Sequence, residues 1–203
     1  MSQISNPIMS NPIMSNTIVS FDAESLILVD AHDRDVGYKD KLTCHLGKGL
    51  LHRAFSLFIF NSNGELLIQQ RSPQKKLWPL YWSNSCCSHP IYGETIENAI
   101  ERRLQQELGF TTQLQYLYKF QYQVAYLNIG SEHELCSVFI GHHDAASLTV
   151  NRNEIADWQF ISIQNLTKMM ARYQDQITPW FKLEWAHLMT TYSHELHALS
   201  TIK

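Results

Sequence analysis

The chain has few cysteines, no long apolar run and no concentration of charge. Four cysteines occur among the 203 residues, and two of them, Cys86 and Cys87, are adjacent. Adjacent cysteines do not easily bridge each other, so a disulfide framework is a poor interpretation. The sequence contains no run of eighteen apolar residues and no basic-then-apolar leader, which favours a cytoplasmic protein.

Charge is nearly balanced. Sixteen basic and nineteen acidic residues give a net charge of −3, and no basic tract is present. Neither nucleic acid nor an anionic membrane is therefore indicated as a partner. Any anionic ligand must be held by a local cluster of basic side chains. The sequence leaves the oligomeric state open.

The first twenty residues differ from the rest. They contain no charge, and SNPIM, SNPIM and SNTIV follow one another as a near-repeat with prolines at positions 7 and 12. Proline breaks a helix and the segment is too short for a core, so we expect residues 1–20 to form a flexible tail. Residues 21–203 are long enough for one domain, which is our expectation.

Strand-like and helix-like segments alternate from Phe21 onward. The stretch Asn61–Ser62–Asn63–Gly64 predicts a hairpin between strands 53–61 and 65–72. Apolar residues recur at helical spacing from Ile96 to Leu108, and Gly109 follows as a stop signal. The other expected elements are strands over 25–30, 80–86, 113–126, 132–142 and 154–162, and helices over 163–173 and 179–198. The pattern predicts a mixed α/β (α+β) domain with an extra C-terminal helical part.

Two adjacent cysteines and a histidine, in SNSCCSHP, lie just ahead of the helical segment GETIENAIERRLQQELGF. From Glu94 to Phe110 this segment resembles the Nudix box, a loop and helix that holds divalent metal against a diphosphate. Three positions depart from the box: Ser88 replaces a glycine, and Arg103 and Gln106 replace acidic residues. Of the acidic residues on the helix of the Nudix box, this sequence retains only Glu107. The resemblance implies a Nudix-like mixed sheet sandwiched by helices.

A second set of residues suits a metal ion. Glu132 and Glu134 are two apart on a predicted strand, so both carboxylates point to one face. His45, His52 and His89 add imidazoles. Such a set suits Mn²⁺, Zn²⁺ or Mg²⁺ in a roughly octahedral shell, with imidazole arguing against a purely Mg²⁺ site. Spacing alone is weak evidence, because seven other histidines occur, at positions 32, 133, 142, 143, 187, 194 and 197.

Over roughly residues 25–190 the chain resembles the type I isopentenyl-diphosphate delta-isomerases. Three stretches carry the resemblance: Ser83 to Pro90, Glu132 to Cys136, and Thr178–Pro179–Trp180 with Trp185. It implies that isopentenyl and dimethylallyl diphosphate are interconverted, in isoprenoid synthesis, by protonation and deprotonation through a tertiary carbocation. It also implies that one tightly bound divalent metal is held by His45, His52, His89, Glu132 and Glu134.

The resemblance further assigns the residues that act on the carbon skeleton. Glu134 is the expected acid, assisted by the phenol of Tyr122, and Cys87 is the second proton carrier on the opposite side of the substrate. The sequence leaves open which of the two delivers the first proton. Trp185 is expected to face the cation. Isomerisation needs such groups because an alkene is a very weak base, so its acid must be positioned and shielded from water. Cys44, Cys86 and Cys136 are interpreted as small buried hydrophobes.

The diphosphate needs basic residues of its own. Arg71, Lys75 and Arg103 match basic positions of the family, and Lys41 matches less closely. Arg103 exchanges a metal-binding carboxylate for a direct phosphate ligand. Glu107 is expected to hold a Mg²⁺ that arrives with the substrate, together with the backbone carbonyl of Cys87.

Two other functions compete with the isomerase. A Nudix-type diphosphate hydrolase with an altered box would release phosphate or a nucleoside monophosphate, and would give Cys87 no role. A non-catalytic metal-binding module would use the His/Glu cluster only to stabilise the fold. Such a module would lose stability on chelation and show no turnover.

Overall fold

The computed structural model describes residues 17–144 and 148–199. A nine-stranded sheet with five helices and one short 3-10 helix makes up this part of the chain. The strands are β1 (Ser25–Val29), β2 (Asp35–Asp40), β3 (His52–Phe60), β4 (Glu65–Arg71), β5 (Trp82–Ser83), β6 (Cys86–Ser88), β7 (Leu114–Tyr126), β8 (Gly130–His142) and β9 (Ile155–Ser162). The helices are α1 (Lys41–His45), α2 (Ile96–Leu108), α3 (Ile163–Arg172), η1 (Gln174–Gln176), α4 (Pro179–Thr191) and α5 (Ser193–Leu199).

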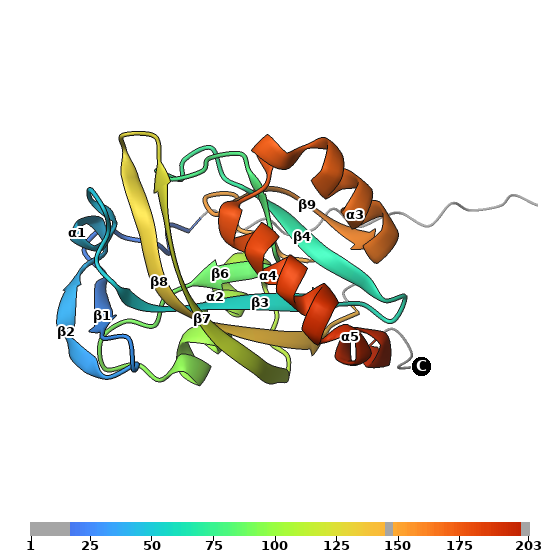
Figure 1. The fold of residues 1–203 in the computed structure, drawn as a ribbon, viewed down its shortest axis with the longest axis horizontal. Helices are drawn as coiled ribbons and strands as arrows, with labels where there is room; N and C mark the ends of the chain where they lie inside the picture. The colour runs from blue at the N-terminus through green and yellow to red at the C-terminus, as the bar shows by residue number, and fades with distance from the viewer. Residues whose placement is uncertain (1–16, 145–147, 200–203) are drawn as a thin grey trace, which may run out of the picture.

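Strand β3 lies at the centre of the sheet. It pairs in parallel with β8 and antiparallel with β1, β4 and β6. Its side chains alternate between two cores, because successive strand residues point to opposite faces. Phe55, Leu57 and Ile59 pack with the apolar side of α2, whereas Phe58 and Phe60 pack with α4. The sheet is therefore covered by helices on both faces (Figure 1), which confirms the predicted mixed α/β architecture.

Local sequence signals fix the ends of helix α2. The hydroxyl of Thr95 accepts the backbone N–H of Asn98 at the start, and Gly109, with φ 77°, closes the last turn by donating to Leu104 and Gln105. Glycine adopts this left-handed conformation without a steric penalty. The hairpin predicted at 61–64 is also confirmed, with Gly64 at φ 70°.

Two predicted elements are interrupted. The single strand expected over 80–86 is instead two short strands, β5 and β6. The side chain of Asn84 donates to the carbonyls of Leu57 and Cys86 there, and Ser85 Oγ accepts from the N–H of Ile59. These side chains take over bonds that a continuous ladder would make. The helix expected over 179–198 ends at Thr191, and α5 begins at Ser193.

Three short elements were not predicted from the sequence. Strand β2, helix α1 and helix η1 are six, five and three residues long. Strand β2 is mostly exposed and carries Gly37 at φ 123°. Short, polar elements give little hydrophobic periodicity, so the pattern did not reveal them.

The end of the predicted tail contacts the domain. The backbone carbonyls of Thr17 and Val19 accept from Asn151 and Arg103, and Ser20 Oγ accepts from Lys41. Residues 17–20 are thus joined to the folded part by hydrogen bonds. The SNPIM repeat at 1–16 lies outside the described residues, so the extent of the tail and the single-domain boundary stay predictions.

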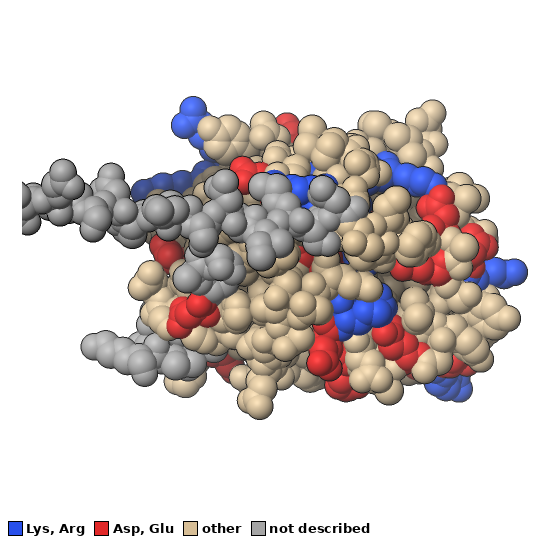
Figure 2. Space-filling view, turned by 180° about the vertical axis from the view of Figure 1, so that it is seen from behind, with Lys and Arg blue, Asp and Glu red and all other residues tan. Residues whose placement is uncertain are grey.

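The surface mixes charges of both signs. Seen from behind, acidic and basic side chains are scattered among uncharged ones on the visible face (Figure 2), as the small net charge suggests. No helix of the described segments is long and apolar enough to cross a membrane.

Candidate active site and metal cage

Strand pairing brings the predicted metal ligands together. The parallel register of β3 and β8 places His52 beside Glu134. Glu132 lies two residues earlier on β8, with its side chain on the same face. His45 ends helix α1, which approaches β8 at Gly130. A Cβ at Gly130 would lie 2.5 Å from the carbonyl oxygen of His45, so only glycine permits this approach.

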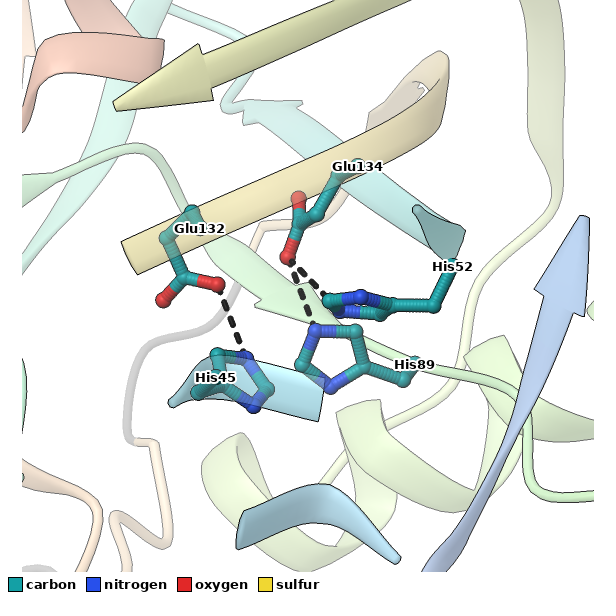
Figure 3. Close-up of side chains that lie close together, drawn as sticks. All are labelled: His45, His52, His89, Glu132 and Glu134. Atoms are coloured by element: carbon teal, nitrogen blue, oxygen red, sulfur yellow. Dashed lines mark hydrogen bonds and ion pairs between the residues drawn. The ribbon is translucent and has the colours of Figure 1, made fainter. Parts of the chain in front are cut away.

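Five side chains converge at this point: His45, His52, His89, Glu132 and Glu134. One donor atom from each lies within 4.8 Å of the others, and we call this group the metal cage (Figure 3). His45 Nε2 lies 2.9 Å from Glu132 Oε2, and His89 Nε2 lies 2.8 Å from Glu134 Oε1. The second ring nitrogen of His45 and of His52 contacts a backbone carbonyl, that of Lys41 at 2.6 Å and that of Leu50 at 2.7 Å. These contacts orient both imidazoles with Nε2 toward the cage.

Burial and mutual charge set the ionisation of the cage. Burial opposes the ionisation of Glu132, but neighbouring His45 holds the pKa of that carboxyl at about 2. Burial, then the nearby Glu132, raises the pKa of Glu134 well above its ordinary range. Burial, then His45, lowers the pKa of His52 to about 4. Burial, then His52, also lowers the pKa of His89. For His45, burial is outweighed by Glu132, which raises the pKa. His52 and His89 are thus neutral imidazoles, the form that binds metal.

The cage fits a divalent cation by its donor chemistry. His52 Nε2 is buried and makes no hydrogen bond, and Glu132 Oε2 is buried beside the His45 ring. Buried polar atoms are rarely left without a partner, and an ion is one way to satisfy them. Three nitrogen and two carboxylate donors suit Mn²⁺, Zn²⁺ or Fe²⁺-like ions better than Mg²⁺ alone. The predicted grouping of all five residues is therefore present in the structure, which does not identify the metal.

The two expected proton carriers flank the same cavity. It has a volume of about 420 Å³, and Cys87, Tyr122 and Glu134 line it. Tyr122 stands opposite Glu134 in the β7–β8 ladder, and its hydroxyl donates to Glu134 Oε2 at 2.7 Å. Cys87 comes from β6 and donates to Asn84 Oδ1 at 2.7 Å. Burial raises the pKa of the Cys87 thiol, so the protonated form prevails in the free protein.

All four predicted phosphate ligands line the cavity: Lys41, Arg71, Lys75 and Arg103. Arg71 donates to the carbonyls of Leu77 and Trp78. Lys41 Nζ lies 2.9 Å from Glu24 Oε2, and Lys75 pairs with Glu154. These cations are present at the cavity, but each already has an oxygen partner.

The fourth predicted phosphate ligand, Arg103, lies in a buried group that we call the charge network: Lys75, Arg103, Glu107 and Glu154. Arg103 Nη2 lies 2.6 Å from Glu107 Oε1 and 3.1 Å from Glu154 Oε2. Burial opposes the ionisation of Glu154, but Lys75 and Arg103 hold the pKa of that carboxyl at about 2. Glu107, the expected Mg²⁺ ligand, sits behind Arg103 and is not among the described residues that line the cavity.

Comparisons with known proteins identify the fold and family of this arrangement. Residues 50–181 match the family model described as the NUDIX domain. The chain belongs to the Nudix family. Isopentenyl-diphosphate Delta-isomerase 1 of Photorhabdus laumondii is 44% identical over 175 residues, covering 85% of this chain and 99% of the relative. The isopentenyl-diphosphate delta-isomerase of Schizosaccharomyces pombe is 35% identical and covers 82% of each chain. Within the Nudix family, the chain therefore belongs with these isomerases.

Solved structures support the Nudix fold. A Deinococcus radiodurans protein superposes with a TM-score of 0.60 at 24% identity, covering 74% of this chain and 90% of the other. The MutT protein of Methanosarcina mazei superposes with a TM-score of 0.53 at 17% identity, covering 64% and 87%. At these identities the likeness shows the fold alone.

One expectation for this Nudix site needs correction. Trp185, predicted to face the cation, is 4% exposed and packs against Phe58 and Phe181, away from the cavity lining. Trp180 lines the cavity instead. The two are five residues apart on α4, which turns by ~100° per residue, so they point in directions about 140° apart. The sequence motif contained both tryptophans, and only the helix geometry separates them.

Sequence reasoning also missed three residues around the Nudix site. Asn84 accepts from the Cys87 thiol, and Ser56 Oγ lies 3.4 Å from the same sulfur. Glu154 joins Lys75 to Arg103. Asn84 lies within the SNSCCSHP stretch, which was a signal that it belongs to the site. Ser56 and Glu154 gave no signal, because each is a single polar residue at a strand position.

Proposed function

We propose that this protein interconverts isopentenyl and dimethylallyl diphosphate, using the metal cage, Tyr122 and Cys87 on one cavity. The observation that carries the proposal is the convergence of a carboxyl, a phenol and a thiol on one cavity that basic residues also line. A hydrolase has no need of the thiol. Membership in a family with named isopentenyl-diphosphate isomerases supports the same substrate.

The acid that protonates the alkene is Glu134. The Tyr122 phenol donates to Glu134 Oε2, and burial, then the charge of Glu134, raises the pKa of Tyr122 well above its ordinary range. The phenol therefore stays protonated and keeps one carboxyl oxygen oriented. A divalent ion held by the cage would orient Glu134 and lower the pKa of its carboxyl, which eases proton release at neutral pH.

Cys87 serves as the second proton carrier. Glu134 gives its proton to C4 of isopentenyl diphosphate, which produces a tertiary carbocation at C3. The Cys87 sulfur, after its thiol has released its own proton, takes the proton from C2, and the new double bond forms. The proton gained at C4 and the proton lost from C2 balance, so no oxidant or reductant is needed. Cys87 lines the cavity together with Glu134, which suits two carriers that act on one bound substrate.

Trp180 stabilises the cation through its ring face. Its Nε1 donates to Ser83 Oγ at 3.1 Å, and its ring meets that of Trp78 in a T-shaped contact with the centroids 5.2 Å apart, so the indole is held in place. A nucleophilic oxygen would trap the carbocation, whereas a π face does not. Cation–π contacts are worth about 2 kcal/mol or more when desolvated.

The diphosphate binds the basic residues of the cavity. Arg71, Lys75 and Arg103 line the cavity and would exchange their present oxygen partners for phosphate oxygens. A Mg²⁺ that accompanies the diphosphate would be held with the help of Glu107, once Arg103 turns to the phosphate. This second ion is distinct from the ion of the cage.

Proton NMR of isopentenyl diphosphate, incubated with the protein and Mg²⁺ in D₂O, tests this function. The proposal expects dimethylallyl diphosphate with deuterium incorporated. Monophosphate or free phosphate would favour the hydrolase. An unchanged spectrum, from protein that loses stability on chelation, would favour the non-catalytic metal-binding module.

A further inference from the structure

Helix α4 places a carboxyl group behind Cys87. Glu184 is 0% exposed, and its Oε2 atom is buried without a hydrogen-bond partner. Its Oε1 atom lies 3.7 Å from Cys136 Sγ on β8. A buried acid with one unpaired oxygen is costly unless it has a function or stays neutral. Nothing in the mechanism above uses this side chain.

A serine connects this carboxyl to the thiol. Ser56 is opposite Cys87 in the antiparallel ladder of β3 and β6, and Ser56 Oγ lies 3.4 Å from Cys87 Sγ. The hydroxyl of Ser56 also hydrogen-bonds the Glu184 side chain. Ser56 is therefore the contact between Glu184 and the sulfur.

The surroundings of Glu184 keep it neutral at neutral pH. Burial raises the pKa of its carboxyl to about 8, opposed by hydrogen bonds with Ser56 and Cys136. The titratable and charged groups that face it are Cys87 on β6, Cys136 and Glu134 on β8, and Tyr118 on β7, whose hydroxyl donates to the Glu184 backbone carbonyl. These neighbours are neutral or acidic.

The direction of the hydrogen bonds follows from that neutral state. A protonated Glu184 donates to Ser56 Oγ, which leaves the Ser56 hydrogen free to point at Cys87 Sγ. The Cys87 thiol in turn donates to Asn84 Oδ1. An ionised Glu184 can only accept, so it would draw the Ser56 hydrogen away from the sulfur.

We propose that Glu184 is a positioning residue, which acts through Ser56 to keep a hydrogen-bond donor on the Cys87 sulfur. The inference rests on the proposed role of Cys87 as a proton carrier. The donor orients the thiol and stabilises the negative charge that forms on sulfur when it gives up its proton. Glu184 itself does not touch the substrate, because it is not one of the described residues that line the cavity.

The test measures kcat and KM as a function of pH for four proteins. In the wild type, kcat falls as the pH rises through about 8, while KM changes little. Glu184→Gln keeps a permanent N–H donor, so this alkaline fall disappears. Below about pH 8, Glu184→Leu lowers kcat by roughly ten- to hundredfold, because a hydrogen bond to a charged group is lost. Ser56→Ala lowers kcat similarly and also loses the alkaline fall.

Infrared difference spectra give a readout independent of turnover. The carboxyl band that is present in the wild type and missing from Glu184→Gln should titrate near pH 8. Glu97→Gln, at an exposed position on α2, is the matched control and should keep the wild-type rate and pH profile.

A Glu184→Gln variant that retains the wild-type alkaline fall would overturn the positioning role. A Glu184→Leu variant with wild-type kcat would also overturn it. If Glu184 only stabilised the fold, its replacement would change stability and leave the pH profile unchanged. An active Cys87→Ala variant would instead overturn the role proposed for Cys87, and the positioning role with it. The two failures are therefore distinguishable.

Discussion

The metal cage and the charge network are both buried clusters of ionisable side chains, yet they are organised differently. In the cage, the donor atoms converge on one another, and one of them, His52 Nε2, has no hydrogen-bond partner. In the charge network, Arg103 bridges Glu107 and Glu154, and Lys75 pairs with Glu154. The cage is thus incomplete without a cation, whereas the network is already neutralised by its own members.

This difference indicates when each cluster meets its ligand. A preformed set of donors binds an ion with little rearrangement, so the ion is a resident of the folded protein. A self-paired network must break its ion pairs before phosphate can bind Arg103 or Mg²⁺ can bind Glu107. We therefore expect the cage to be filled without substrate and the network to respond to the diphosphate.

The largest expected effect is the loss of kcat when a proton carrier, Glu134 or Cys87, is replaced. Glu134→Gln and Cys87→Ala should each lower kcat by roughly 10² to 10⁴, because general acid–base groups contribute about that much. Steady-state kinetics of isomer formation measures it. Cys86→Ala should matter little, since Cys86 is fully buried on the opposite face of the strand. Comparable losses in the two cysteine variants would contradict the assignment of Cys87.

Breaking the charge network should reduce stability. Arg103→Leu leaves the Glu107 carboxylate buried without its ion pair and leaves Glu154 with Lys75. It should lower the free energy of unfolding by about 3–5 kcal/mol. Urea unfolding measures the loss. The neighbouring Arg102 pairs with Glu94 nearer the surface, so Arg102→Leu should cost about 1 kcal/mol or less. Equal losses for the two arginines would show that the network does not stabilise the fold.

The network should also make stability depend on acid pH. Despite burial, Lys75 and Arg103 hold the pKa of Glu154 at about 2 in the folded protein, against an ordinary value of 4.5. A depressed pKa stabilises the fold above the unfolded value and ceases to do so as pH falls through the folded one. The wild type should therefore lose ~3 kcal/mol of unfolding free energy between these two pH values through Glu154. Glu154→Gln should remove that share of the acid dependence, as unfolding curves at several pH values would reveal.

The smallest expected effect distinguishes the two tryptophans. Trp180→Phe should lower kcat by up to about thirtyfold, the equivalent of ~2 kcal/mol, with little change in KM. Trp185→Phe, at a position packed in the core, should affect stability more than kcat. A larger fall in kcat for Trp185→Phe than for Trp180→Phe would restore the original expectation.

The sequence predicted the long elements and the cage well. Strands β3, β4, β7, β8 and β9 and helices α2 and α3 lie within two residues of their expected bounds, because each has a clear hydrophobic period. The pairing of Glu132 with Glu134 on one face followed from strand geometry alone. His45, His52 and His89 could be added to them only through the resemblance, since residues far apart in sequence give no spacing signal.

Other features depend on tertiary packing and were not predictable. Trp180 and Trp185 have the same chemistry, and only their places on α4 decide which one lines the cavity. In the sequence, nothing distinguishes Glu184 from an ordinary glutamate on a helix, but in the structure the sheet beneath α4 buries it completely. Arg103 was expected to be free for phosphate, whereas Glu154, from a distant part of the chain, pairs with it. Such contacts exist only after the strands have assembled.

Counting bound ions tests the central claim most directly. Metal-stripped protein is titrated with Mn²⁺, and the bound ions are counted by electron paramagnetic resonance, first without and then with an unreactive isoprenyl diphosphate analogue. The account predicts one tightly bound ion without the analogue, lost in His45→Ala combined with Glu132→Ala, and a second ion only when the analogue is present. Two tight ions without the analogue, or none, would contradict it.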